Sequence, residues 1–418
     1  MHSHSFEDVL SRAERRRPAR ARARARVALA LTVLPLTVAT IVGLVLLWPS
    51  GHTPTPPAFA AAGATFPSGQ VVSLQHTSCE KAGGGAQAPT PPAPGQPVCG
   101  SALVKVSNGV DTGRQVRVDV PPDVMRAGLS GGVLLLRTPA QGNAPATYSL
   151  QDVQRGFPLV TLGVIFALVV VAVAKLRGLL ALVGLGFATV VVGVFMLPAL
   201  LQGSNAMWVG LTGSSAIMLV VLYLAHGLSA RTTTALLGTF AGLGMTAGIA
   251  ALAVRLAHLT GLSSDENSLL QSLTTQLNPR DLLTCGIILA GLGVLNDVTI
   301  TQTSAVWELR EAAPDLSAGR LFGTAMRIGR DHIASTIYTI VFAYAGAALP
   351  VLLLIELYQQ PLASVLTSND IAEELVRTLA SAIGLVLAVP LTTALAVFVA
   401  RADGRPLARA GLAAPAPA

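Results

Sequence analysis

Eight separate apolar segments constrain this chain more than any other feature of its sequence. Each is 17 to 26 residues long, and a helix of about 20 apolar residues crosses the roughly 30 Å hydrocarbon core of a bilayer. Only 12% of the 418 residues are charged, against about 25% in soluble proteins. We therefore predict an all-α polytopic membrane bundle of about eight transmembrane helices. The segments are Val27–Trp48, Pro158–Ala174, Leu179–Leu201, Met207–Leu228, Thr233–Leu256, Leu282–Trp307, Ile333–Leu357 and Leu375–Ala400.

A polar segment, residues 49–155, separates the first apolar segment from the second. Its Pro- and Gly-rich stretches are typical of linkers. Short runs of alternating apolar and polar residues, such as Gln115–Val120, predict strands, and Asn108-Gly109 is typical of a turn between strands. We therefore predict a small β-rich domain between the first and second transmembrane helices. The remaining seven helices would form a membrane domain over residues 156–401.

The distribution of Lys and Arg predicts the orientation, because short cytoplasmic loops carry an excess of both. With the N-terminus inside, 18 of the 28 basic residues lie on the cytoplasmic side. Seven of the other ten lie in residues 49–155, a loop too long to count for much in this rule. We therefore predict that both termini, residues 1–26 and 402–418, are cytoplasmic and that the β-rich domain is extracytoplasmic.

The N-terminal tail, residues 1–26, carries eight arginines. We interpret it first as a cytoplasmic anchor that sets the orientation, and the alternative is an arm that binds anionic lipid. The segment Val27–Trp48 is longer than the 7–15 apolar residues of a signal-peptide core, so we predict an uncleaved signal anchor. The lipid bilayer is the main predicted partner, and the net charge of +7 needs no nucleic acid to explain it.

Three cysteines are present in the chain. Cys79 and Cys99 lie in the β-rich segment, where an extracytoplasmic location favours a disulfide between them; two free thiols are the alternative. Cys285 lies within the sixth apolar segment. The sequence contains neither a Cys/His cluster with metal-ligand spacing nor a recognisable nucleophile with a paired base. We therefore predict no metal, no cofactor and no enzymatic activity.

The sixth apolar segment contains an aspartate, Asp297, near its middle. A carboxylate at the centre of a transmembrane helix costs about 2.5–3.5 kcal/mol on insertion scales and usually has a function. Helical spacing places Thr301 and Ser304 on the same face as Asp297, and Asn296 lies beside it. We therefore predict a buried polar site at this position, facing other helices or a water-filled cavity.

Three interpretations of Asp297 remain open. The first is an ion or proton site in a translocation path, with neighbouring oxygens as ligands. The second is pairing with a basic group of a neighbouring helix, and the third is a hydrogen bond that only stabilises the bundle. Arg330 and Asp331 lie just before the seventh apolar segment. They are either interface anchors or, together with His332, part of a gate or ion pair near the inner end of the sixth helix.

Four motifs carry a family resemblance: Gly291 to Glu308 with Asn296-Asp297, Ile328 to Asp331, Leu349 to Leu353, and Ala382 to Thr392. Together they resemble the YibE/F-like family of bacterial integral membrane proteins. The resemblance implies an N-terminal helix, an outside domain and a membrane bundle, in a protein often labelled a permease. It implies no substrate and no catalytic residues. Family members usually carry an apolar residue where Asn296 stands, which leaves open whether the polar site of this chain is wider.

These observations together predict a permease or secondary transporter of the bacterial inner membrane, with Asp297 in the path of an unknown small solute or ion. The alternative is a non-transporting scaffold or sensor whose β-rich domain binds a partner in the cell envelope. A second copy of the chain is a further partner that the sequence leaves open.

Overall fold

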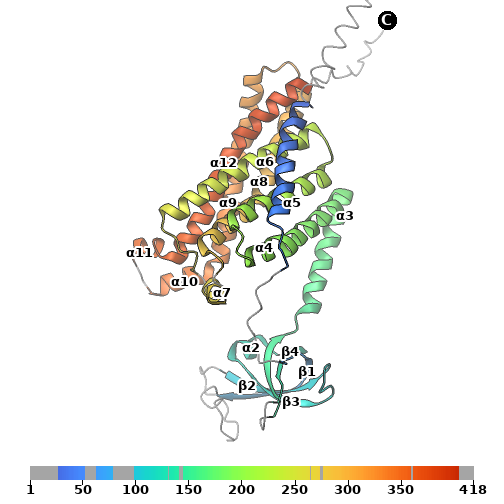
Figure 1. Cartoon of the computed structure of the whole chain (residues 1–418), viewed down its shortest axis with the longest axis vertical. Coiled ribbons are helices and arrows are strands. Elements are labelled where there is room, and N and C mark those ends of the chain that lie inside the picture. The colour runs from blue at the N-terminus through green and yellow to red at the C-terminus, as the bar shows by residue number, and fades with distance from the viewer. Residues whose placement is uncertain are drawn as a thin grey trace, which may run out of the picture. The chain divides into compact units, whose positions relative to one another are not determined.

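The structure, a computed structural model, describes residues 27–51, 63–78, 98–129, 131–140, 145–263, 265–273, 276–358 and 361–403. The chain divides into two compact units, a smaller one of Thr55–Val170 and a larger one of Met1–Pro54 with Val171–Ala418. The smaller unit contains the strands, and the larger unit contains most of the helices (Figure 1). The predicted fold class, a helical membrane bundle with a β-rich domain after its first helix, is confirmed.

The smaller unit contains five strands and one short helix before the start of α3. They are β1 Ser68–Ser78, β2 Val98–Val106, β3 Gln115–Val120, α2 Pro122–Ala127, β4 Gly132–Thr138 and β5 Thr147–Val153. The strands form one antiparallel sheet in the order β3-β2-β1-β4-β5. Alternate residues of each strand point to opposite faces, so Val116, Val118 and Val120 of β3 are buried while their neighbours are exposed. The sheet curls until β3 contacts β5, and it nearly closes into a barrel around this apolar core.

A polar cluster fastens the turn between β2 and β3 to the last two strands. Arg137 Nε donates a hydrogen bond of 2.7 Å to Asp111 Oδ2, and the Tyr148 hydroxyl donates to the same oxygen. The hydrogen bond from Tyr148, followed by that from Arg137, lowers the pKa of Asp111 from its ordinary value of 3.8. The carboxylate is therefore charged at neutral pH and holds the turn against the sheet.

The helices include six that are long and apolar enough to cross a membrane within the described residues, or seven if α9 and α10 form one bent span. The sequence predicts about eight, and two places account for the difference. The helices are an N-terminal helix Val27–Leu46, α3 Gly156–Val190, the π-helix η2 Val191–Met196, α4 Leu197–Leu201, α5 Ala206–His226, α6 Ala230–Leu256, α7 Asp265–Leu273, α8 Pro279–Ala312, α9 Ala318–Ala347, α10 Leu349–Tyr358, α11 Leu362–Leu366 and α12 Asn369–Asp403.

The first place is Lys175, inside α3. Gly156–Leu201 forms one helical run of 46 residues, which is about 69 Å long at 1.5 Å per residue and more than twice the thickness of the hydrocarbon core. The backbone leaves the helical conformation at Lys175, where φ is 52° and ψ is −133°. This break lies between the two predicted segments, so they are separate helices that meet at a kink instead of a loop.

The second place is Ala348, between α9 and α10. The sequence predicts one continuous span over Ile333–Leu357, whereas the two helices are bent by 64° relative to each other. Pro350 explains the bend, because proline has no N–H to donate to the carbonyl of Gly346 and its ring crowds that carbonyl.

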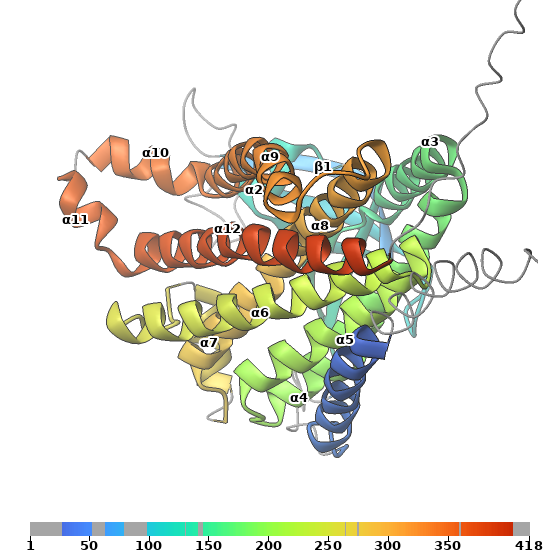
Figure 2. The same ribbon diagram turned by 90° about the horizontal axis from the view of Figure 1, so that it is seen from above.

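The centre of the larger unit is the contact among α6, α8 and α12, and Figure 2 shows α6 and α12 side by side. Glycines let these helices approach closely. A Cβ on Gly242 of α6 would lie 2.7 Å from Leu295 Cδ2 of α8, and a Cβ on Gly384 of α12 would overlap Thr246 Oγ1 of α6. Small residues at helix contacts matter in membranes, because the lipid supplies no hydrophobic force that presses helices together.

We expect Gly384→Ala to destabilise the protein by about 1–3 kcal/mol, because the added methyl group overpacks the contact between α6 and α12. The matched control is Gly248→Ala on α6, where a Cβ would meet nothing within 4 Å. The measurement is the thermal unfolding temperature of both purified variants in detergent. Equal unfolding temperatures for the two variants would show that the close contact at Gly384 is not needed.

Candidate functional site

Asp297 lies close to the middle of the 34-residue helix α8, and its side chain is 68% exposed. Gly293, one turn before it, and Thr301, one turn after it, are exposed as well. The face predicted from helical spacing therefore exists, but it points away from the bundle. The prediction of a buried polar site around Asp297 is wrong.

The opposite face of α8 makes the helix contacts and explains this orientation. Leu292, Leu295 and Thr299 are buried on that side, where α8 packs against α6 and α12. Inside a membrane, large apolar side chains that pack closely against neighbouring helices gain dispersion contacts. A stripe of glycine, alanine and polar residues offers fewer such contacts, so it is the more exposed side of α8.

Asp297 faces one basic residue of the next long helix, His332 of α9. The distance between Asp297 Oδ2 and His332 Nε2 is 3.6 Å, which fits an ion pair but is too long for a direct hydrogen bond. The His332 side chain is 28% exposed. Of the three interpretations of Asp297, this contact favours pairing with a basic group on a neighbouring helix. It also places two titratable groups together near the middle of α8.

The other predicted residues do not gather around Asp297. The Ser304 hydroxyl donates to a backbone carbonyl of its own helix. Asn296 is half-buried, and its Oδ1 is buried with no hydrogen-bond partner among the described residues. Arg330 and Asp331 are exposed on α9. The next residue, His332, is the one that lies close to Asp297 of α8.

The cysteines form neither a disulfide nor a metal site in the described part of the chain. Cys79 lies outside the described residues, and Cys99 is described only by the backbone pairing of β2 with β1. The disulfide between them stays a prediction. Cys285 is a buried free thiol of α8 that packs on Gly210 of α5. Within the described residues, no three His, Cys, Asp or Glu side chains come together as a metal site.

Polar side chains link the central helices. Thr239 of α6 and Thr299 of α8 share a hydrogen bond of 2.7 Å. Gln302 of α8 donates to Thr393 of α12 at 2.8 Å and to a backbone carbonyl of α9 at 3.0 Å. The Ser381 hydroxyl of α12 is buried with no partner among the described residues, and such a group is usually satisfied by water. The central contact therefore contains polar groups that can bind water inside the bundle.

Glu373, near the start of α12, is a buried carboxylate with only 1% of its surface exposed. Its Oε1 accepts hydrogen bonds from the Gly261 N–H at 2.8 Å and from Asn369 Nδ2 at 3.1 Å, and its Oε2 accepts one from the Ser263 hydroxyl at 2.5 Å. These bonds tie the segment after α6 to α12. The sequence carries little signal for this site, because two of the donors lie about 110 residues before Glu373. The adjacent Glu374 is also a glutamate, so residue type does not show which of the two is buried.

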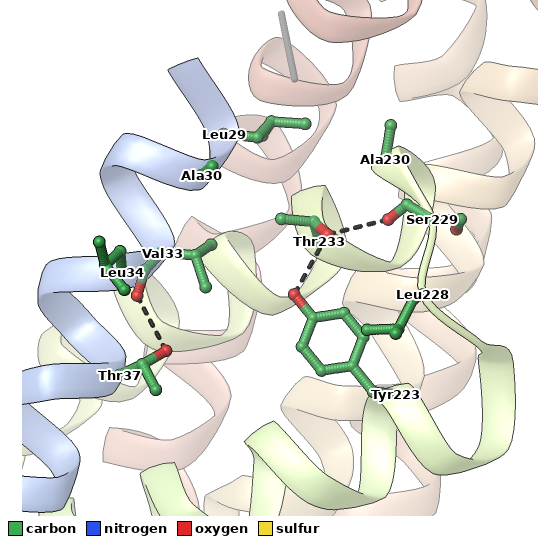
Figure 3. Close-up of a pocket in the computed structure, with 10 residues that line it drawn as sticks. All are labelled: Leu29, Ala30, Val33, Leu34, Thr37, Tyr223, Leu228, Ser229, Ala230 and Thr233. Atoms are coloured by element: carbon green, nitrogen blue, oxygen red, sulfur yellow. Dashed lines mark hydrogen bonds between the residues drawn. The ribbon is translucent and has the colours of Figure 1, made fainter. Parts of the chain in front are cut away.

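Two cavities lie along the N-terminal helix where it packs against α5 and α6. The first has a volume of about 590 Å³ and lies where α5 turns into α6 (Figure 3). Leu29 and Val33 line it on the N-terminal helix, and Tyr223 and Thr233 line it on the other side, joined by a hydrogen bond of 3.1 Å. The second cavity has a volume of about 540 Å³ and is lined mainly by apolar residues further along the same helix and α6.

A sequence model of one protein family, described as YibE/F-like protein, matches residues 162–402. The match covers more than half of the chain and begins after the last strand of the β-rich unit. It confirms the family resemblance seen in the motifs of α8, α9 and α12. No curated protein and no solved structure matches the chain.

Replacing Glu373 by Ala should destabilise the protein by about 1–3 kcal/mol, because a buried N–H at Gly261 loses its acceptor. The measurement is the thermal unfolding temperature in detergent. Glu374→Ala is the matched control, since it removes a neighbouring carboxylate that makes only a half-exposed ion pair with Arg377, at 3.6 Å. An unchanged unfolding temperature for Glu373→Ala would contradict a structural role for the buried carboxylate.

Proposed function

The chain belongs to the YibE/F-like family, and from that premise we propose that it is a permease of the bacterial inner membrane. It would move a small solute or ion in a cycle coupled to protons or cations. The observation that carries the proposal is the pair of Asp297 and His332, 3.6 Å apart near the middle of α8. Ionisable residues at this depth are rare and usually belong to ion paths or proton relays.

The chemistry of the pair suits such a cycle. Imidazole is the side chain that gains or loses a proton most readily near neutral pH. A proton or a cation that binds Asp297 weakens its attraction to His332, and the release of that ion restores the attraction. A coupling ion could in this way change the contact between α8 and α9. Because the Asp297 side chain is exposed, the proposed path runs along the face of α8 that carries it.

The shapes of several helices support a transport cycle. Discontinuous or bent helices are common where transporters bind substrates and coupling ions, since they leave backbone groups free to interact. In this chain α9 and α10 are bent by 64°, α3 is kinked at Lys175 and η2 is a π-helix. Breaks of this kind in the described bundle supply positions where helices can change their angle.

The orientation that we propose places both termini in the cytoplasm and the β-rich unit outside it. Contacts at one end of the bundle support the predicted sidedness. Arg231, after the turn between α5 and α6, lies 3.5 Å from Glu308 near the end of α8. Leu29, at the start of the N-terminal helix, lines the same cavity as Ser229 of that turn. Three segments with a predicted cytoplasmic location therefore share one end.

We expect Asp297→Asn to abolish coupled flux, because the amide cannot take up a proton or carry the charge that pairs with His332. The measurement uses purified protein in liposomes that contain a pH-sensitive dye, with an imposed membrane potential driving proton entry. Glu308→Gln is the control, since it neutralises another exposed carboxylate of α8. Proton entry at the wild-type rate in correctly inserted Asp297→Asn protein would refute the proposed role.

A second candidate function is a scaffold or sensor, and the separate β-rich unit favours it. That unit has its own apolar core, and all of its strands lie before the residues that match the family. A domain of this kind could bind a component of the cell envelope while the helices only anchor it.

Deleting residues 55–150 distinguishes the two functions. The proposed permease should keep a measurable part of its proton flux in liposomes, because Asp297, His332 and the central helices remain. A scaffold or sensor would instead lose its cellular function completely while the wild-type protein shows no flux. The comparison needs a check by membrane fractionation that the shortened protein is still inserted.

A further inference from the structure

We propose that the seam between the N-terminal helix and helices α5 and α6 is a binding site for one anionic phospholipid. The seam consists of the two cavities of about 590 Å³ and about 540 Å³ described above. Both volumes fall within the range of about 300–1,000 Å³ that is usual for small-molecule sites. The proposal is independent of transport, because none of the lining residues belongs to the face of α8 that carries Asp297.

The length of the seam fits one lipid tail. The cavities are lined along α6 from Ala230 to Gly244, a distance of about 21 Å at 1.5 Å per residue. One leaflet contributes about half of the roughly 30 Å hydrocarbon core. An acyl chain that enters at the turn between α5 and α6 would therefore reach beyond the middle of the bilayer within the seam.

Both cavities are mostly apolar, and the walls of the seam become more apolar along this length. The first cavity contains the hydroxyls of Thr37, Tyr223, Ser229 and Thr233 among ten lining residues. The second contains those of Thr40, Thr212 and Ser215 among fourteen. Figure 3 shows Tyr223 and Thr233 across the first cavity from the N-terminal helix. A ligand that fits both parts has a polar end and a long apolar tail, which describes a phospholipid.

The donor and the acceptor can be assigned for the hydrogen bond between the Tyr223 and Thr233 hydroxyls of the first cavity. Thr233 has one hydroxyl proton and donates it to the Ser229 carbonyl at 2.9 Å. The hydrogen bond of 3.1 Å between Tyr223 and Thr233 is therefore donated by Tyr223. The Tyr223 oxygen keeps its lone pairs for a donor on a ligand, and a hydroxyl of a glycerol headgroup provides such a donor.

The charges near this end favour an anionic headgroup. Arg177 and Arg231 are both close enough to His226 to interact with it electrostatically. Arg231 is one third exposed and also lies 3.5 Å from Glu308, so Arg177 supplies the positive charge that is not paired with a described carboxylate. The α6 helix begins here with Ser229 as its N-cap, so the positive end of its dipole points the same way. Basic residues attract anionic lipids at a membrane surface.

The experiment is native mass spectrometry of the full chain, purified from vesicles of phosphatidylglycerol and phosphatidylcholine with the same tails. We expect one retained phosphatidylglycerol per chain and much less phosphatidylcholine. Ala30→Phe places a ring in the first cavity and should lower the retained phosphatidylglycerol about tenfold. Ala28→Phe is the matched control, because Ala28 is exposed on the same helix and does not line either cavity.

Tyr223→Phe tests the polar end of the site without changing its shape. The loss of one hydrogen bond should lower phosphatidylglycerol retention about two- to tenfold, and this variant keeps the proposal testable if Ala30→Phe does not fold. Equal retention by Ala30→Phe and Ala28→Phe would overturn the site. Equal retention of the two lipids by the wild-type protein would overturn its preference for an anionic headgroup.

Discussion

Close contact among α6, α8 and α12 is the constraint on which the rest of the membrane unit depends. Glycines such as Gly242 and Gly384 bring the three backbones together, and threonine and glutamine side chains form hydrogen bonds between them. Once the apolar side of α8 is committed to this contact, its other side must face outward. The position of Asp297 on the surface of the bundle is therefore a consequence of how the centre packs.

Segment length and hydropathy predict most of this architecture. The polar interval with alternating apolar residues is the sheet that contains Val116, Val118 and Val120, and the apolar segments are helices. The two differences from the predicted helices have local reasons. The sequence separates two apolar segments around Lys175 but does not show that they meet at a kink, where Lys175 has a positive φ. The bend at Ala348 was missed because Pro350 lies within a segment that is otherwise apolar enough to be one span.

The candidate site shows what helical spacing can and cannot predict. The spacing correctly places Asp297 and Thr301 on one face, but it does not say whether that face turns inward, because this depends on the helices that compete for each side. The partner on α9, His332, was identified only as one of several residues near the inner end of α8. Glu373 was missed because its burial depends on Gly261 and Ser263, which are distant in sequence.

The bonds of Glu373 also restrict how the bundle can move. They join the segment after α6 to the start of α12, so these two helices cannot separate at that end without leaving a buried carboxylate unpaired, which is costly. Their opposite ends have no such tie among the described residues, and meet there through Gly238 and Thr392. A rearrangement of α6 against α12 would therefore be a hinge motion. The two helices would stay together at Glu373 and separate near the turn that leads from α5 into α6.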